Sequence, residues 1–249
     1  MITVVVTGAA GKMGRQVCQT VLADPELRLV GGVDMVSLGT DLGKLLGLEP
    51  ANVTISNNLE QVLNTTSPDV MVDFTHPSSV MDNIRTAVKC GVHAVVGTTG
   101  ITEENLAEIR SLCERANVNA FIAPNFALGA VLMMKFSAMA SKYFPYVEIV
   151  ELHHNQKADA PSGTAIKTAE MLVAEKATGE EKETVSGARG GEINQVHIHS
   201  VRLPGLVAHQ EVIFGGQGQT LTIRHDSIDR TSFMPGVVMA IKAVQNRSG

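Results

Sequence analysis

Near the middle of the chain, five consecutive positions contain His153, His154 and Lys157. A few residues later, Ser162-Gly163-Thr164 has the composition of a helix N-terminus, with Ser162 as the capping residue. Cationic side chains beside unpaired backbone N–H groups bind anions, carboxylates above all. A histidine can also deliver a proton near neutral pH. The stretch therefore predicts a site that binds a dicarboxylic substrate and protonates it beside a hydride donor.

The same histidines have two other interpretations. They can be solvated side chains beside a capped helix, or they can join His197, His199 and His209 in a metal site. Because neither cysteine nor carboxylate accompanies them in a metal-binding spacing, we expect no metal. Arg202 and Arg224, on strands expected to be neighbours, are candidate substrate contacts, but we favour salt bridges at the edge of the core.

A second chemical motif lies at the start of the chain. The turn Gly8-Ala9-Ala10-Gly11-Lys12-Met13-Gly14 follows a β-branched run and opens a helical pattern. Small residues let the backbone approach a pyrophosphate, and the helix N-terminus offers N–H groups to its charge. Asp34, twenty residues after Gly14, ends the next expected strand, where a carboxylate can accept hydrogen bonds from ribose hydroxyls. This combination predicts a dinucleotide site.

Two further loops follow expected strands. They are Gly97-Thr98-Thr99-Gly100 and Ala123-Pro124-Asn125-Phe126. Because open α/β sheets bind ligands at the carboxyl ends of their strands, both are candidate cofactor contacts. Read alone, each is equally an ordinary Gly or Pro loop.

The identity of the dinucleotide is less constrained. Asp34 repels a 2′-phosphate, and Met35 stands where an NADP-selective enzyme often carries arginine, whereas Lys12 can attract a phosphate. We therefore expect NADH to bind well and leave NADPH open.

The elements that position these motifs alternate over the first half of the chain. Residues 12–23 carry apolar side chains at helical spacing, and the β-branched run at 2–6 has the pattern of a strand buried on both faces. Strands alternating with helices imply a parallel sheet with helices on both faces. The expected strands are 2–6, 27–33, 69–74, 93–97 and 119–123, and the expected helices are 12–23, 77–89 and 102–116. Residues 38–58 are expected to be a loop with a short helix.

The pattern changes after Pro124. We expect helices at 128–143, 162–175 and 234–245, strands at 147–153, 195–203, 210–214 and 219–225, and a mobile loop at 176–194. The fold class is therefore α/β, with a Rossmann-like dinucleotide-binding domain and an α+β substrate and oligomerisation domain built on an open mixed sheet. Residues 1–125 and 229–249 are assigned to the first domain and 126–228 to the second.

Composition narrows the class of protein. The 249 residues include 44% hydrophobic and 18% charged residues, with a net charge of −5, which favours a globular chain and argues against nucleic-acid binding. Cys18, Cys90 and Cys113 form no CxxC pair and are expected to be reduced thiols. We see no signal peptide, and the longest apolar stretch, 120–134, is interrupted by a Pro-Asn pair. We therefore expect a cytoplasmic protein with no membrane span.

Together these motifs resemble the dihydrodipicolinate reductase family over essentially the whole chain. The segments that carry the resemblance are Gly8–Gly14, Asp73–Pro77, Val96–Gly100, Ala123–Phe126, Glu151–Ala165, Val207–Gly215 and Arg224–Arg230. The resemblance implies an NADH- or NADPH-dependent oxidoreductase of diaminopimelate and lysine biosynthesis. Its reaction would reduce the cyclic imine 4-hydroxy-tetrahydrodipicolinate (dihydrodipicolinate) to tetrahydrodipicolinate.

The resemblance also implies roles for single residues. His153 would be the proton donor and Lys157 a second donor, while His154, Gly163 and Thr164 would bind substrate. The cofactor contacts would be Gly8, Ala9, Ala10, Gly11, Lys12, Met13, Asp34, Gly97, Thr98, Thr99, Ala123, Pro124, Asn125 and Phe126. Members of the family are typically homotetramers assembled through the second domain's sheet.

Two alternatives stay open from the residues. The chain could be another Rossmann-fold reductase that acts on a different imine or keto acid, or a dinucleotide-sensing protein without catalysis. The His-His and Ser-Gly-Thr segments argue against the first. The second leaves His153 and Lys157 without a role.

Overall fold

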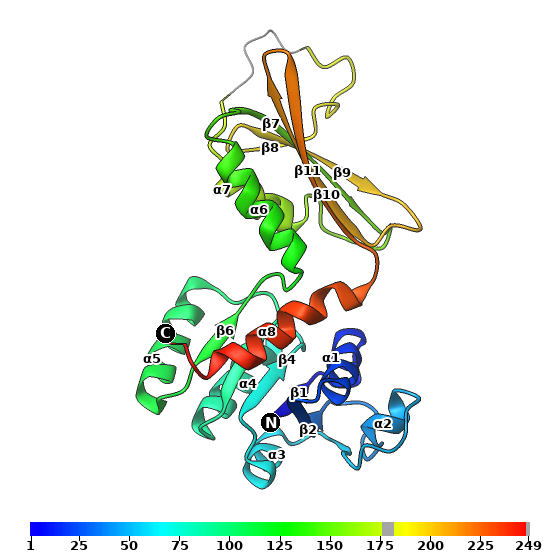
Figure 1. The fold of residues 1–249 in the computed structure, drawn as a ribbon, viewed down its shortest axis with the longest axis vertical. Coiled ribbons are helices and arrows are strands. Elements are labelled where there is room, and N and C mark those ends of the chain that lie inside the picture. Colours follow the sequence, from blue (N-terminus) through cyan, green and yellow to red (C-terminus); the bar gives the residue numbers. More distant parts are fainter. Residues whose placement is uncertain (176–181, 248–249) are drawn as a thin grey trace. The chain divides into compact units, whose positions relative to one another are not determined.

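The computed structural model describes residues 1–175 and 182–247, which form two compact units (Figure 1). Unit 1 comprises Met1–Phe126 and Phe233–Gly249, and unit 2 comprises Ala127–Ser232. The chain thus leaves the first unit once and returns to it for its last helix. The assignment of cofactor to the first unit and of substrate and assembly to the second stays a prediction.

Unit 1 is built on a six-stranded sheet in the order β3-β2-β1-β4-β5-β6, and its strand pairs are parallel. The strands are β1 Ile2–Thr7, β2 Leu27–Val33, β3 Ile55–Ser56, β4 Val70–Asp73, β5 His93–Val96 and β6 Ala120–Ile122. Val4, Val5 and Val6 have no exposed surface, as expected for a strand covered on both faces. Since every pair is parallel, the carboxyl ends of the strands lie at one edge.

Helices cover both faces of this sheet. Alternate residues of β1 point to opposite faces: Val4 and Val6 pack with α1 and α8, and Val5 packs with α3, α4 and α5. The helices are α1 Lys12–Ala23, α2 Leu42–Leu45, α3 Leu59–Thr66, α4 Pro77–Lys89, α5 Glu103–Ala116 and α8 Met234–Val244. Figure 1 shows α8, in red, lying against unit 1. Polar contacts fasten it there: the Asn119 amide donates to the Val244 carbonyl, and Lys242 pairs with Asp24 and with Glu26.

Unit 2 contains a five-stranded mixed sheet in the order β11-β10-β7-β9-β8. β7 and β9 run parallel, and the other neighbours run antiparallel. The elements are α6 Leu128–Ala140, β7 Tyr146–His153, α7 Gly163–Met171, β8 Gly191–Ile193, β9 Val196–Arg202, β10 Ala208–Gly216 and β11 Gln219–Ser227, and a 3-10 turn at Arg230–Phe233 precedes α8. One face buries Ile149, Ile198 and Phe214 under α6 and α7.

The fold class expected from the sequence is confirmed, and several boundaries are corrected. Helix α3 was missed; it begins after Asn58, whose side chain accepts from the Gln61 amide. β3 and β8 lie within segments expected to be loops, because edge strands of two or three residues carry too little periodicity to read. α6 ends at Ala140 and α7 at Met171, both earlier than expected.

Part of the expected loop at 176–194 lies outside the described residues, namely 176–181. The strands of Arg202 and Arg224 are not neighbours as expected, because β7 and β10 lie between β9 and β11. Among the helices formed by residues 1–175 and 182–247, none is long and apolar enough to cross a bilayer.

Candidate active site

At two positions of the segment that leads from β1 into α1, only glycine fits. Gly8 has a φ of +74°, and a Cβ added there would lie 2.2 Å from the Phe74 carbonyl oxygen. A Cβ on Gly14 would lie 1.9 Å from the Gly8 carbonyl oxygen. Gly11 begins α1, and no side chain among residues 1–175 or 182–247 caps this helix end. The first-turn N–H groups are therefore available to an anion, as a pyrophosphate site requires.

Asp34, at the end of β2, is fixed by backbone donors. One carboxylate oxygen accepts from the Ala10 amide at 2.9 Å, and the other accepts from the amides of Met35 at 2.7 Å and Val36 at 3.2 Å. The carboxylate therefore ties the end of β2 to the glycine turn. Asp34 also lines the cavity that the turn borders, where its remaining acceptor capacity can meet a ribose.

A cavity of about 360 Å³ opens at this edge of unit 1. Three expected cofactor residues line it: Gly8, Gly11 and Asp34. The other lining residues are Thr7, Val33, Met35, Asn57, Leu59, Phe74, Thr75, His76, Ser79 and Asn83. From the sequence, Phe74, Thr75 and His76 were given no cofactor role. They directly follow β4 at the same carboxyl edge, and this position could have indicated that they line the site.

A buried carboxylate organises the neighbouring loops. Asp73, with no exposed surface, accepts from the hydroxyls of Thr7 at 2.8 Å and Thr98 at 2.5 Å, and from the Asn83 amide at 2.8 Å. It also accepts from the Thr75 hydroxyl at 2.9 Å. These donors come from β1, the loop after β5, α4 and the loop after β4. One side chain thus connects the ends of three adjacent strands.

Several of the expected cofactor residues have side chains that are buried or already hydrogen-bonded, so only their backbone could contact a cofactor. Ala9 and Ala10 are buried in the core, and the Thr98 hydroxyl is committed to Asp73. Phe126 is buried against Phe74, with ring centroids 5.8 Å apart. The remaining expected positions, Lys12, Met13, Gly97, Thr99, Ala123, Pro124 and Asn125, do not line the described cavity.

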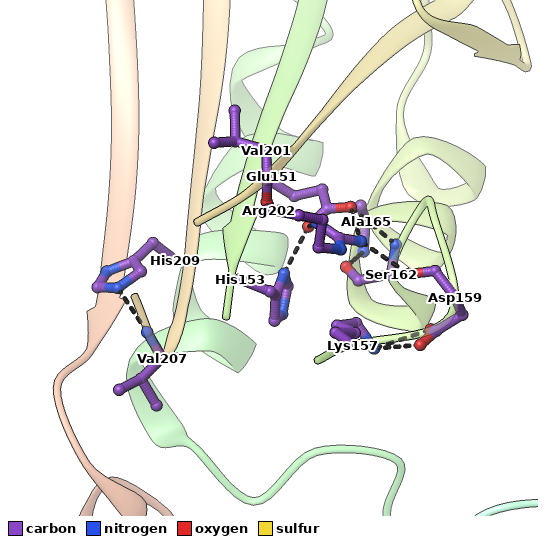
Figure 2. A network of polar contacts seen from close by, with 10 residues as sticks. All are labelled: Glu151, His153, Lys157, Asp159, Ser162, Ala165, Val201, Arg202, Val207 and His209. Carbon is purple, nitrogen blue, oxygen red and sulfur yellow. Dashed lines mark hydrogen bonds and ion pairs between the residues drawn. The ribbon is translucent and has the colours of Figure 1, made fainter. Parts of the chain in front are cut away.

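In unit 2 the end of β7 meets the start of α7 around Glu151 (Figure 2). This side chain has no exposed surface, and its Oε2 lies 2.5 Å from His153 Nδ1. Arg202 on β9 donates to both oxygens, at 2.7 and 2.8 Å. Burial alone would raise the pKa of Glu151, but the hydrogen bonds from His153, Arg202 and Ser200 lower it to about 2. The carboxylate is therefore ionised at neutral pH.

The start of α7 has the architecture expected of an anion site. The Ser162 hydroxyl accepts from the Ala165 amide at 3.2 Å, so Ser162 is the N-cap. A Cβ on Gly163 would meet nothing within 4 Å, which leaves the backbone of the first turn accessible to a ligand. His154 is exposed.

Lys157 is engaged by an acid. Its Nζ donates to both carboxylate oxygens of Asp159, at 2.6 and 2.8 Å. The hydrogen bond from Lys157 lowers the pKa of Asp159. Figure 2 shows Lys157 and Asp159 on the same side of the β7–α7 junction as His153. A substrate carboxylate that binds Lys157 has to replace this ion pair or share it.

His199, His209 and Arg224 form ion-pair contacts away from Glu151. His199 Nε2 lies 2.8 Å from Glu148, and His209 Nδ1 lies 2.6 Å from Asp226. Arg224 pairs with Asp226 at 2.8 Å and with Glu211. Nowhere in residues 1–175 or 182–247 do three potential metal ligands gather. Arg202 and Arg224 thus both form salt bridges, the interpretation that we favoured from the sequence.

Comparison with known proteins shows one family over the full length. Residues 2–126 match the model described as dihydrodipicolinate reductase, N-terminus, and residues 129–249 match dihydrodipicolinate reductase, C-terminus. The 4-hydroxy-tetrahydrodipicolinate reductase of Syntrophomonas wolfei is 53% identical and covers 98% of this chain and 94% of its own. That of Moorella thermoacetica is 52% identical and covers 100% and 94%.

Solved structures agree. The dipicolinate-bound dihydrodipicolinate reductase from Paenisporosarcina sp. TG-14 is 46% identical, has a TM-score of 0.87, and covers 99% of this chain and 95% of its own. An amine dehydrogenase from Mycobacterium smegmatis is 17% identical with a TM-score of 0.69, over 99% of this chain and 93% of its own, and shows likeness of fold alone.

Proposed function

The chain belongs to the dihydrodipicolinate reductase family, and we propose from this membership how its own residues carry out the family's reaction. The activity is the NADH- or NADPH-dependent reduction of 4-hydroxy-tetrahydrodipicolinate to tetrahydrodipicolinate, a step of diaminopimelate and lysine biosynthesis. In this proposal unit 1 binds the dinucleotide and unit 2 binds the substrate.

The residues of unit 1 fit a dinucleotide. The turn at Gly8–Gly14 leaves no room for a Cβ at two of its glycines, and the uncapped first turn of α1 suits a pyrophosphate. Asp34 would hold the adenosine ribose, and the loops Gly97–Thr99 and Ala123–Phe126 would contact the rest of the cofactor. When bound, the dinucleotide supplies a hydride.

The cavity chemistry favours NADH. Asp34 supplies a negative charge, and among the described residues that line the cavity His76 alone can carry a positive one. No lysine or arginine is among the described residues that line this cavity, so a 2′-phosphate there would meet the charge of Asp34 without a lining cation of that kind, which opposes NADPH. Met35, at the position where arginine would favour NADPH, is 76% exposed.

In unit 2, the first turn of α7 at Gly163 and Thr164 would bind one substrate carboxylate through backbone N–H groups. His154 and Lys157 would add positive charge around the substrate. The Lys157 amine is paired with Asp159 in the free chain, so a substrate carboxylate would compete with this acid for it.

His153 would complete the reaction by protonating the carbon next to the site of hydride addition, where negative charge accumulates. Lys157 would neutralise part of that charge and that of the carboxylate. The observation that carries this proposal is the arrangement of His153 and Ser162 on a single buried carboxylate, because it holds a proton donor beside a helix N-terminus.

Assembly and location are finer proposals. A homotetramer is supported by the face of the unit 2 sheet opposite α6 and α7, where Tyr146, Val150 and Ile213 line a cavity of about 270 Å³. Sedimentation velocity on the purified chain checks this proposal; a monomer would contradict it.

A cytoplasmic location is supported by the three cysteines of the chain, which form no disulfide in the described residues.

One assay tests the function. NADH and NADPH oxidation is followed with freshly generated cyclic imine, with pyridine-2,6-dicarboxylate as inhibitor. We expect turnover with both cofactors, a higher kcat/KM for NADH, and competitive inhibition. Turnover of unrelated keto acids but not of the imine would favour another Rossmann-fold reductase, and binding of NADH without turnover would favour a dinucleotide sensor.

A further inference from the structure

Glu151 makes more contacts than a structural ion pair needs. Three of the residues it joins lie at the ends of different elements: His153 ends β7, Ser162 caps α7, and Arg202 ends β9. Each lies at a different element, so this carboxylate sets the mutual position of a strand end and a helix start. The side chain is fully buried, and its geometry is therefore held by packing as well as by hydrogen bonds.

The contact with His153 selects one ring nitrogen. Nδ1 lies 2.5 Å from the carboxylate, at the distance of a charge-assisted hydrogen bond. An anionic acceptor keeps a proton on the nitrogen that faces it, so Nδ1 is committed and Nε2 is the nitrogen that exchanges a proton with a ligand. Arg202 binds both carboxylate oxygens of Glu151 and so fixes the carboxylate. The fixed carboxylate in turn holds the orientation of the His153 ring.

Arg202 prevents the carboxylate from turning. Its two nitrogens bind the two oxygens of Glu151, and one of them also donates to the Asp159 carbonyl oxygen at 2.7 Å. The carboxylate raises the pKa of Arg202, so the guanidinium stays charged. Without the carboxylate this cation would face His153 across a buried space and would oppose an imidazolium there.

We propose that Glu151 is the positioning residue of the proton-transfer step: it fixes His153 so that Nε2 delivers the proton, and it holds the Ser162 amide so that the substrate-binding end of α7 stays in register with that nitrogen. The inference rests on the proposed role of His153. It adds a residue to the site and assigns the ring nitrogen that acts.

The same strand provides a matched control. Glu148, three residues earlier on the other face of β7, also contacts a histidine and an arginine, His199 at 2.8 Å and Arg189. Its side chain is 37% exposed. Glu148→Gln therefore removes a carboxylate with the same kinds of partner from the same strand, without touching His153.

The test compares Glu151→Gln, Glu148→Gln, His153→Ala and the double variant His153→Ala/Glu151→Gln in the full chain. Loss of a group that orients a metal-bound histidine costs about 10- to 100-fold, and by analogy we expect kcat of Glu151→Gln to fall by about 30-fold with KM for NADH within about twofold of wild type. We expect Glu148→Gln to keep kcat within about twofold. The solvent deuterium isotope effect on kcat should rise in Glu151→Gln, because proton transfer becomes slower.

The double variant separates positioning from general stability. If Glu151 acts through His153, the double variant turns over within about threefold of His153→Ala, because groups that act as a unit are not additive. Losses that multiply, an unchanged kcat in Glu151→Gln, or an equal loss in Glu148→Gln would each overturn the inference. If Glu151→Gln does not fold, Glu151→Asp replaces it, and a wild-type kcat there overturns the inference. By contrast, full turnover of His153→Ala refutes the proposed proton donor itself.

Discussion

Strand β7 carries two glutamates whose polar partners are alike and whose surroundings differ. Glu148 pairs with His199 and Arg189 and keeps 37% of its side chain exposed. Glu151, on the opposite face, pairs with His153 and Arg202 and has no exposed surface. The chemistry of the residues is the same, so the difference comes from what lies beside them.

The neighbour that matters is α7. Glu151 accepts from the Ser162 amide at the helix start, and its histidine ends the strand next to that helix. Glu148 lies on the face of the sheet away from α6 and α7, and its side chain stays partly exposed in the single chain. A carboxylate, histidine and arginine thus form a partly exposed ion-pair cluster in one place and, in the other, a buried cluster that would fix the proposed proton donor.

The largest expected effect separates the two histidines. His153→Ala should lower kcat by about 1000-fold, since general acid catalysis contributes about 10²- to 10⁴-fold, while the Kd for NADH stays at the wild-type value. The control His199→Ala removes the matching ring from the Glu148 cluster and should turn over at the wild-type rate. Steady-state kinetics and fluorescence titration of NADH measure both. Equal losses in the two variants would show that the clusters are equivalent and remove the distinction drawn here.

The second effect is on stability in acid. The pKa of Glu151 is lowered from 4.5 to about 2, so its ionised form stabilises the fold above the unfolded pKa, and that stability is lost as pH falls through this window. The contribution is on the order of 3 kcal/mol. We expect the free energy of unfolding of Glu151→Gln to depend less on pH between 4.5 and 2 than that of wild type.

Urea unfolding across this range measures the effect, with Glu148→Gln as the control. The pKa of Glu148 is also lowered, with burial opposing the hydrogen bonds from Arg189 and His199, but its exposure leaves a smaller contribution. If the free energies of unfolding of Glu151→Gln and wild type changed in parallel with pH, folding would not lower the pKa of Glu151, and this prediction would be wrong.

A third carboxylate extends the comparison to unit 1. Asp34 is held by three backbone amides, yet it also lines the cavity proposed to bind the cofactor. Asp34→Ala should raise KM for NADH by about 10-fold, because ribose hydrogen bonds to a charged acceptor are worth about 1.5–3 kcal/mol and part of that is recovered by water. KM for NADPH should change less. A loss confined to NADPH would contradict the ribose assignment.

The smallest effect concerns Lys157. Asp159 is 59% exposed at its side chain and competes with substrate for the Lys157 amine. Asp159→Asn removes the competing charge and should lower KM for the imine by about two- to threefold, because exposed ion pairs are worth about 0.2–1 kcal/mol. kcat should stay at the wild-type value. The exposed pair Lys167–Glu170 on α7 supplies the control Glu170→Gln, for which we expect no change. A higher KM in Asp159→Asn would show that Asp159 positions the amine instead of competing for it.

Motifs contiguous in sequence could be predicted, and contacts between distant residues could not. The turn from Gly8 to Gly14, the helix start at Ser162 and the alternation of strands and helices follow from local spacing. Helix α3 was not predicted, because its apolar pattern is only two turns long and follows an irregular segment. Phe74 and His76, which line the cavity beside the glycine turn, were given no role, since their position depends on β4 lying beside β1.

The sequence by itself determined the fold class, the dinucleotide turn and the cationic stretch around His153, because short-range sterics and hydrogen bonding encode them in neighbouring residues. Tertiary structure alone decided which distant side chains hold each buried carboxylate. Glu151 and Arg202 are 51 residues apart, and Thr7 and Asp73 are 66 apart. Only the pairing of β7 with β9 and of β1 with β4 brings these side chains within hydrogen-bond distance, and burial then strengthens the contacts.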